Sequence, residues 1–261
     1  MAFRASNIKN ISRFNSAVSC SILDSYEKYV DNMISTKNSE PTSRTFAPSG
    51  FRCKRKMWFR LRGTEPDKIL NPDRALHFSA EIGTACHRII QKNLQNMLNE
   101  NWIDVEQYLN QHCKFSFNVR KDPESDETQV EIIDLPVRFA CDGIIRIDNK
   151  YYLLEIKSCD RNTFQDMTDA KQEHIDQVKC YSALINIEDV IFLYIDRTYG
   201  EMKCYQYKIS DFDKEKVISD MKYVMQCVDT NIPPDPLPSG DKWCSSNYCL
   251  YYAKCKEWGR S

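Results

Sequence analysis

The spacing of hydrophobic positions changes at about residue 113. Before it, apolar side chains recur three and four residues apart, which predicts helices at 15–35, 51–63 and 75–100. After it, apolar and polar residues alternate, which predicts strands. We expect four strands, at 113–120, 128–134, 136–148 and 150–158. They are followed by a helix at 169–187, strands at 189–196 and 201–209, and a helix at 210–230. This order of helices, a strand meander and then mixed elements predicts an α+β fold.

Length and composition restrict the function further. The chain has 261 residues, 42% of them hydrophobic, which is enough for one sizeable domain or for one core with an appendage. The net charge of −1 gives no sign of a general polyanion binder, so any nucleic-acid contact must come from local patches. With 7 glycines, the chain has neither a G-x-x-x-x-G-K nor a G-x-G-x-x-G phosphate loop.

The sequence predicts a cytoplasmic protein. It has no apolar run of the length that a transmembrane helix needs, and residues 1–20 lack the apolar segment of a secretory signal. In a reducing compartment the 12 cysteines are not expected to form disulfides, which leaves them available as metal or cluster ligands.

Two charges close the strand pattern at 150–158. Glu155 and Lys157 lie two residues apart and therefore on one face, and a turn at 148–150 would place Asp142 beside Glu155. Clustered carboxylates repel one another unless a cation is present, and oxygen ligands suit Mg²⁺ or Mn²⁺. A lysine beside such an ion fits metal-assisted phosphodiester hydrolysis. The alternative is a solvated hairpin face.

Two helices add polar side chains in phase. His87 lies on the apolar stripe of the 75–100 helix, where a histidine can also be an ordinary core residue. His174, Gln177 and Tyr181 follow at spacings of three and four, so they share one helical face, which can equally be a half-buried surface.

Taken in order, G-x-x-x-H, D-x12-E-x-K and Q-x-x-x-Y resemble the RecB-type branch of the PD-(D/E)XK nucleases over about residues 48–196. The resemblance implies a mixed central sheet flanked by helices. It implies that Asp142, Glu155, His87 and the backbone carbonyl of Ile156 are metal ligands and that Lys157 positions or activates the attacking water. The same resemblance implies that Gln177 and Tyr181 order the site and the DNA backbone. Phe139 and Cys141 depart from the family pattern, which has Gly and Pro there.

The cysteines at opposite ends carry a second resemblance. "CKRKMW" after "APSGFR" is similar to the first-cysteine motif of CRISPR-associated exonucleases and AddB-type nuclease subunits that hold a 4Fe–4S cluster. It implies that Cys53 joins Cys244, Cys249 and Cys255 as cluster ligands, although the first gap of the terminal trio is longer than the family's. Free thiols and a zinc-stapled structural protein remain as alternatives. The implied domains are 1–47 (helical segment and linker), 48–230 (nuclease core) and 231–261 (cluster-binding segment).

The densest basic run surrounds Cys53 and is interleaved with aromatic residues. Cations for phosphates and aromatic rings for unstacked bases suit single-stranded DNA, while a solvated helix face is the plain alternative. The expected DNA contacts are Arg52, Lys54, Arg55, Lys56, Trp58 and Arg60.

The sequence therefore predicts a metal-dependent deoxyribonuclease that hydrolyses phosphodiester bonds. The expected activity is exonucleolytic, on single strands or DNA ends, in recombination, repair, CRISPR adaptation or phage DNA processing, with a helicase or recombination protein as a possible partner. The alternative from another class is a subunit that holds DNA ends without cutting them.

Overall fold

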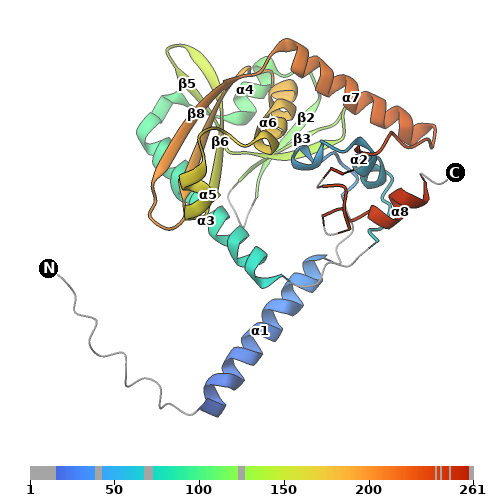
Figure 1. Cartoon of the computed structure of the whole chain (residues 1–261). Coiled ribbons are helices and arrows are strands. Elements are labelled where there is room, and N and C mark those ends of the chain that lie inside the picture. The colour runs from blue at the N-terminus through green and yellow to red at the C-terminus, as the bar shows by residue number, and fades with distance from the viewer. Residues whose placement is uncertain are drawn as a thin grey trace. The chain divides into compact units, whose positions relative to one another are not determined.

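The structure is a computed structural model (Figure 1). It describes residues 16–38, 43–67, 73–122, 127–238, 240–241, 243–246 and 248–258, with side chains at 21–36 and from residue 43 onward. The start of the predicted N-terminal segment, residues 1–15, lies outside the described residues. Of the described residues, 16–38 and 73–79 belong to a smaller compact unit, and 43–67 with those from 80 onward belong to a larger one.

The smaller unit contains α1 (Ser16–Asn38) and the first turn of α3 (Arg74–Leu98). Within it, the guanidinium of Arg74 pairs with Glu27 and Asp31, each at 2.7 Å. The observed helices match the two helices predicted from the apolar spacing in this part of the chain. No described helix of the protein is long and apolar enough to cross a membrane.

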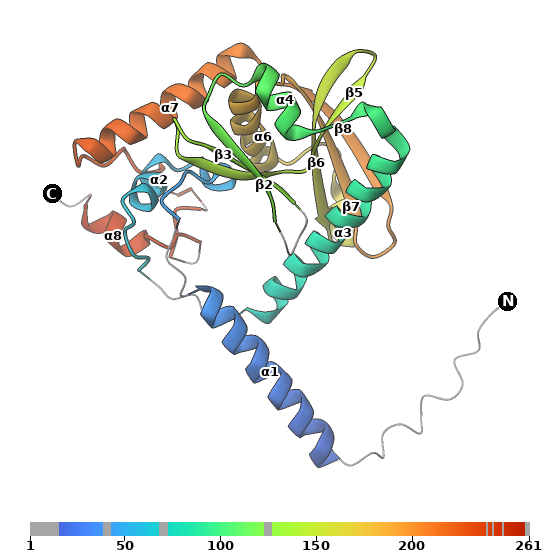
Figure 2. The same cartoon turned by 180° about the vertical axis from the view of Figure 1, so that it is seen from behind.

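The larger unit contains two sheets (Figures 1 and 2). The mixed sheet has five strands in the order β1-β5-β6-β7-β8, in which β6 and β7 are parallel and the other pairs are antiparallel. The second sheet is antiparallel, in the order β2-β3-β4. The prediction of an α+β fold with a mixed sheet is confirmed. The strand bounds are β1 Trp102–Ile103, β2 Phe117–Lys121, β3 Thr128–Ile132, β4 Val137–Cys141, β5 Gly143–Ile147, β6 Lys150–Cys159, β7 Asp189–Asp196 and β8 Met202–Lys208.

The hairpin between β5 and β6 forms where the sequence predicts it. Ile147 pairs with Lys150, and the two residues between them, Asp148 and Asn149, have positive φ angles of 49° and 62°. Asp and Asn tolerate this left-handed conformation, and two such residues make the tight turn whose twist matches that of paired strands. The turn fixes the register of the whole hairpin.

The single strand predicted at 136–148 is wrong, because the chain forms two strands there. β4 pairs with β3 in the three-stranded sheet, β5 pairs with β6 in the five-stranded sheet, and Asp142 lies between them. The next residue, Gly143, lies against the indole of Trp102, so that a Cβ added to it would come within 2.6 Å of the ring. Only glycine fits this close approach.

Helices cover the sheets and carry their own caps. Asp160 and Ser210 accept hydrogen bonds from the backbone N–H groups of Thr163 and Asp213, which satisfies donors at the first turns of α5 and α7. The helices of the larger unit not yet given are α2 Lys54–Leu61, α4 Val105–His112, α5 Arg161–Asp166, α6 Gln172–Ile185, α7 Asp211–Asp229 and α8 Tyr252–Glu257, with short 3₁₀ turns at Pro48–Gly50 and Asn99–Asn101.

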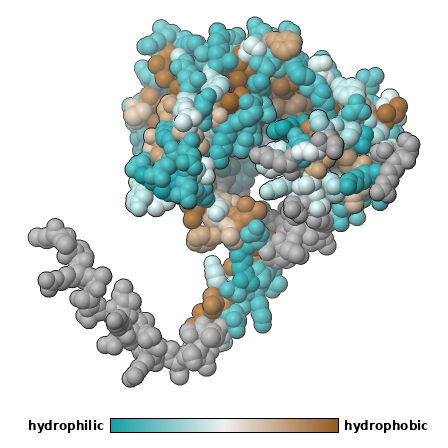
Figure 3. Space-filling view, in the orientation of Figure 1, coloured by the Kyte–Doolittle hydropathy of each residue, from teal (hydrophilic) through white to brown (hydrophobic). Residues whose placement is uncertain are grey.

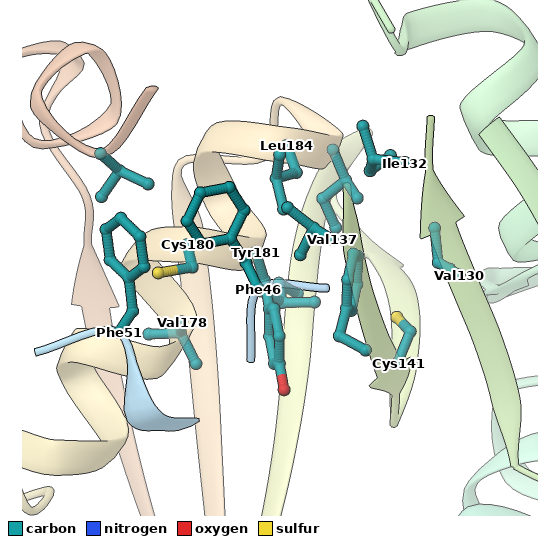
Figure 4. Close-up of a cluster of buried hydrophobic side chains, with 14 of the residues drawn as sticks. Phe46, Phe51, Val130, Ile132, Val137, Cys141, Val178, Cys180, Tyr181 and Leu184 are labelled. Carbon is teal, nitrogen blue, oxygen red and sulfur yellow. The ribbon is translucent and has the colours of Figure 1, made fainter. Parts of the chain in front are cut away.

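The main hydrophobic core lies between α6 and the three-stranded sheet, together with side chains of α2, α4 and α7. Figure 4 shows Tyr181 and Leu184 of α6 near Val137 of β4, with the hydroxyl oxygen of Tyr181 pointing out of the cluster. On the visible face in Figure 3, hydrophilic residues predominate over the larger unit and apolar ones are scattered.

The two faces of β6 have different neighbours. Leu153 belongs to the main core, whereas Leu154 and Ile156 pack in a second cluster with Ile90 of α3. Because side chains alternate along a strand, Glu155 lies on the same face as Leu153, the face that α6 covers. The packing of β6 therefore directs Glu155 toward polar side chains of α6.

Candidate active site

Asp142 and Glu155 meet because of the hairpin register. Gly143 pairs with Leu154, which places the preceding Asp142 next to Glu155. Among the described residues, β6 beyond this point pairs only with β7, so its other edge is open. The N–H of Ile156 on that edge donates to Asp142 Oδ2 at 2.7 Å. The N–H and C=O of one strand residue point to the same edge, so the Ile156 carbonyl faces the same side as Asp142.

Glu155 is held by two donors from different elements. Lys157 Nζ lies 2.5 Å from Glu155 Oε1, and Gln177 Nε2 on α6 donates to the same oxygen at 3.0 Å. The Gln177 amide also donates to the hydroxyl of Tyr181 at 2.5 Å and accepts from Lys157 at 3.4 Å. Lys157, Gln177 and Tyr181 thus form one hydrogen-bonded network around the buried carboxylate.

Phe139, one of the two departures from the family pattern, supports this network. Its ring stacks on the ring of Tyr181, with centroids 4.6 Å apart and an angle of 21°. Both residues are buried. The aromatic side chain therefore fixes the position from which the Tyr181 hydroxyl reaches Gln177.

Helix α3 contributes two side chains to Asp142. His87 Nδ1 lies 3.2 Å from Asp142 Oδ1, and Gln91 Nε2 donates to the Asp142 backbone carbonyl at 2.8 Å. The carbonyl is available because Asp142 lies outside both ladders. Gln91 follows His87 by four residues and so shares its helix face. That spacing is the sequence signal by which Gln91, absent from the predicted site, was detectable.

The site gathers two buried carboxylates beside one lysine and one histidine. Asp142 and Glu155 are 6% and 2% exposed. Burial raises the pKa of Glu155 to about 7; Lys157 opposes this rise and Asp142 adds to it. Burial alone would lower the pKa of Lys157, but the charges of Glu155 and Asp142 outweigh it and raise that pKa. For His87, the contact with Asp142 likewise outweighs burial, and the pKa is raised. A divalent cation would offset the repulsion between the two carboxylates.

The donor set fits a hard divalent cation, whereas the side-chain placement does not form a closed cage. Two carboxylates, an imidazole and a strand carbonyl are the ligand types that Mg²⁺ and Mn²⁺ accept. Within the described part of the chain, no group of three His, Cys, Asp or Glu side chains is placed to hold a metal ion. Their oxygens and nitrogens are instead bonded to one another and to Lys157, Gln177 and Ile156.

The four cysteines from the two ends of the chain line one cavity of about 340 Å³. Burial raises the pKa of Cys53, and the thiols of the other three raise it further. The four thiols are therefore close enough to act on one another, although their sequence positions are far apart. The cavity-lining cysteines are Cys53, Cys244, Cys249 and Cys255.

Local contacts fix Cys53 and Cys255 at this cavity. Cys53 caps the N-terminus of α2, and its Sγ accepts from the N–H of Lys56 at 3.4 Å. Arg55 Nη1 lies 3.4 Å from the Cys255 carbonyl oxygen and 3.8 Å from its Sγ. Arg55 therefore ties α2 directly to α8, which lies beside it in Figure 1.

The same cavity extends to the carboxylate network, because Lys157 and Gln177 also line it. Arg52 and Lys56 add positive charge to its wall, and Trp243 and Tyr248 add aromatic rings. The cavity that the cysteines line is thus bordered by the lysine and the glutamine that contact Glu155.

Two of the expected DNA contacts serve the core instead. Trp58 is fully buried and donates through Nε1 to the Cys227 carbonyl at 2.9 Å, and Arg55 is 6% exposed with its Nε bonded to Pro234 O. Neither has surface to offer to a base or a phosphate. The basic pattern did not show this, because buried and partly exposed positions are mixed within one short helix.

The other four expected contacts keep access to solvent. Arg52 pairs with Asp241 at 2.9 Å and Lys54 with Asp220 at 2.6 Å, whereas Arg60 donates to a backbone carbonyl. Lys56 lines the cavity.

Comparison with known proteins adds little. No protein-family model and no curated protein matches the sequence. Among solved structures, SSO0001 is similar with a TM-score of 0.47 and 15% identity, over 88% of this chain and 96% of that one. The alkaline exonuclease LHK-Exo from Laribacter hongkongensis has a TM-score of 0.32 and 12% identity, over 65% of this chain and 73% of that one. LHK-Exo in complex with dAMP has a TM-score of 0.34 and 13% identity, over 54% of this chain and 67% of that one. These values describe partial backbone likeness, and no role for any residue rests on them.

Proposed function

We propose that this chain is a divalent-metal-dependent deoxyribonuclease of the PD-(D/E)XK type, RecB-like branch, that acts as an exonuclease on single strands or DNA ends. One observation carries the proposal. Asp142 and Glu155, predicted from spacing to lie side by side, are neighbours on the hairpin, and Lys157 pairs with Glu155 and lines a cavity with positive and aromatic walls. A solvated hairpin face would leave these carboxylates exposed, and both are buried.

The metal-binding residues of the proposal are Asp142, Glu155, His87 and the backbone carbonyl of Ile156. A Mg²⁺ or Mn²⁺ ion held there would supply Lewis-acid polarisation of the phosphate and would lower the pKa of a water. The Ile156 N–H holds Asp142 Oδ2, and His87 contacts Asp142 Oδ1. Holding these groups near one another before binding would reduce the entropy cost of assembling the site.

The lysine and its neighbours have the remaining roles. Lys157 holds its positive charge beside the carboxylates, where it orients the attacking water and stabilises charge that develops on the phosphate. Gln177 fixes the rotamers of both Glu155 and Lys157, because it contacts each of them. Tyr181 in turn fixes Gln177. Burial, followed by the charge of Glu155, raises the pKa of Tyr181, so Tyr181 acts as a neutral hydroxyl.

We propose that the four cysteines hold a 4Fe–4S cluster with a structural role. Cysteine thiolates are the ligands of such clusters. Each thiolate would bind a different iron, so the four sulfurs would lie further apart than around one zinc ion. The lining of one cavity by all four cysteines supports the proposal. The cluster would link the segment before α2 to the segment around α8. Folding and cluster binding would then be coupled.

We propose that DNA reaches the site along the cavity wall that contains Arg52 and Lys56, with Lys54 and Arg60 contacting phosphates nearby. Cations on a groove and aromatic rings such as Trp243 and Tyr248 suit a single strand whose bases are unstacked. No base-reading module is proposed, so cleavage is expected to be sequence-independent.

The experiment that tests this function is a digestion assay under anaerobic conditions. Single-stranded and duplex oligonucleotides, labelled separately at the 5′ and the 3′ end, are incubated with protein in Mg²⁺, Mn²⁺ or EDTA. We expect metal-dependent release of short products from an end, and loss of that activity in Asp142→Asn. Binding of DNA ends without cleavage in any metal would instead support the end-binding subunit. Cleavage that continues in EDTA or in Asp142→Asn would refute the proposed site.

A further inference from the structure

His174 lies at the site, and the mechanism above does not use it. It is one turn before Gln177 on α6 and lines the same cavity as Lys157. In the β6–β7 ladder Tyr194 is the direct partner of Lys157, so both side chains stand on one face of the sheet. The ring of His174 packs on that of Tyr194, with centroids 5.7 Å apart. His174 is therefore fixed beside the catalytic lysine.

A chain of hydrogen bonds determines which nitrogen of His174 carries a proton. The N–H of Lys171 donates to the hydroxyl oxygen of Tyr194 at 3.1 Å. Tyr194 is fully buried, so its own hydroxyl hydrogen needs an acceptor, and His174 Nδ1 lies 2.7 Å away. Nδ1 therefore accepts. In a neutral imidazole the other nitrogen, Nε2, then carries the hydrogen.

The Nε2–H is available to a ligand. No described residue forms a hydrogen bond with it, and no buried side-chain nitrogen or oxygen of the described chain lacks a partner, so this atom is open to solvent at the cavity. Burial and the charge of Lys157 lower the pKa of His174 to about 4, so the ring is neutral at neutral pH. Glu173 and Asp176 also border the cavity, so an anion there must be held by specific donors.

We propose that His174 is a substrate-binding residue whose neutral imidazole donates Nε2–H to a non-bridging phosphate oxygen of the DNA strand beside Lys157. This inference rests on the proposed function and adds a donor that binds the strand. A neutral donor gives a directional contact without adding a second cation that would repel Lys157. Because the ring keeps its proton arrangement, it binds the strand and takes no part in proton transfer.

The tautomer is tested first, without DNA or metal. The chain has 4 histidines, so ¹⁵N-labelled imidazole spectra of the full-length protein, compared with those of His174→Gln, identify the His174 signals. We expect an unprotonated Nδ1 and a protonated Nε2 at pH 7, and loss of this preference in Tyr194→Phe. A protonated Nδ1 at pH 7 would overturn the inference.

Binding is tested with a matched pair of substitutions. His174→Gln keeps an N–H donor close to the position of Nε2, whereas His174→Asn keeps only a group near Nδ1 that can contact Tyr194. Affinity is measured by fluorescence anisotropy of a labelled single-stranded oligonucleotide in Ca²⁺, and KM and kcat are measured in Mg²⁺. We expect His174→Asn to lose about tenfold in affinity and to raise KM by a similar factor, with kcat nearly unchanged. His174→Gln should stay close to wild type.

The controls separate a binding role from a structural one. His112→Asn on α4, whose Nδ1 bonds only within its own helix, should leave affinity and KM unchanged. Equal losses in His174→Asn and His174→Gln, or a fall in kcat alone, would overturn the inference. If wild-type protein binds the strand without cleaving it, the proposed function fails while the affinities still decide the role of His174. If the wild type cleaves DNA and His174→Asn matches it, only the inference fails.

Discussion

Replacing Glu155 with Gln should stabilise the metal-free protein, although it removes a residue essential to the proposed activity. Glu155 is 2% exposed, and its pKa is raised from the ordinary 4.5 to about 7. Because the folded-state pKa is the higher one, the stabilising contribution of this carboxyl is complete below pH 4.5 and is lost as the pH rises through 7. At about 1.4 kcal/mol for each pH unit, the ionised carboxylate costs up to about 3 kcal/mol at pH 8.

Gln keeps the shape of protonated Glu and can still accept from Lys157 and Gln177, so it avoids this cost. Lys157 loses part of its neutralisation in the variant, which reduces the gain. We therefore expect Glu155→Gln to be about 1–2 kcal/mol more stable than wild type at pH 8 and equal to it at pH 5. This corresponds to a rise in melting temperature on the order of 5 °C at pH 8.

The assay is thermal or urea unfolding in EDTA at pH 5 and pH 8, with exposed Glu215→Gln on α7 as the control that should change nothing. The same unfolding is repeated with Mn²⁺. Mn²⁺ should raise the melting temperature of the wild type and not that of Glu155→Gln, because binding to the folded state alone adds stability. A variant less stable than wild type at pH 8 in EDTA would refute the claim that burial, rather than Lys157, dominates the energy of this carboxylate.

Three further outcomes follow from the site. Lys157→Ala should lower the cleavage rate by a factor on the order of 10²–10³ while calorimetry shows nearly unchanged metal affinity, because the ammonium is not a ligand. Cys53→Ser and Cys255→Ser should both lose iron and broad visible absorption under anaerobic purification, whereas exposed Cys204→Ser should keep them; full iron content in Cys53→Ser would separate the two ends of the chain. Urea unfolding of His174→Gln and wild type is compared at pH 7 and pH 4.5, and the variant should lose less stability between the two. The lowered pKa of His174 contributes stability to the wild type above pH 6.5, and this contribution is lost as the pH falls through 4.

The carboxylate site could be predicted because it depends on local rules. The turn residues Asp148 and Asn149 fix the hairpin register, and the two-residue period of a strand puts Glu155 and Lys157 on one face. These two steps use neighbours in sequence or a single tight turn, so they needed no knowledge of the tertiary fold. The helical period puts Gln177 on one face with Tyr181, but only the packing of α6 on β6 brings it to Glu155 and Lys157.

The positions that depend on tertiary packing could not be predicted in this way. Tyr194 reads as an ordinary strand aromatic, and only the parallel pairing of β6 with β7 brings it next to Lys157. Trp58 reads as an exposed aromatic in a basic helix, yet it is buried against α7 and the chain end, where its ring meets that of Trp258. The helical period shows which residues share a face and not which face the rest of the protein covers.

The break between β4 and β5 explains why the aspartate of this site can reach its partners. If β4 and β5 were one continuous strand, the backbone groups of Asp142 would be bonded within a sheet. The continued strand would then pair with β6 at Ile156 and cover that edge. Because the chain leaves one sheet at Cys141 and enters the other at Gly143, the Asp142 carbonyl is free to accept from Gln91. The same break leaves the edge of β6 open at Ile156. The Ile156 N–H donates to the Asp142 carboxylate, and the Ile156 carbonyl faces the same side. A strand pattern without an interruption in its apolar alternation conceals this break, and Gly143 is its one visible mark.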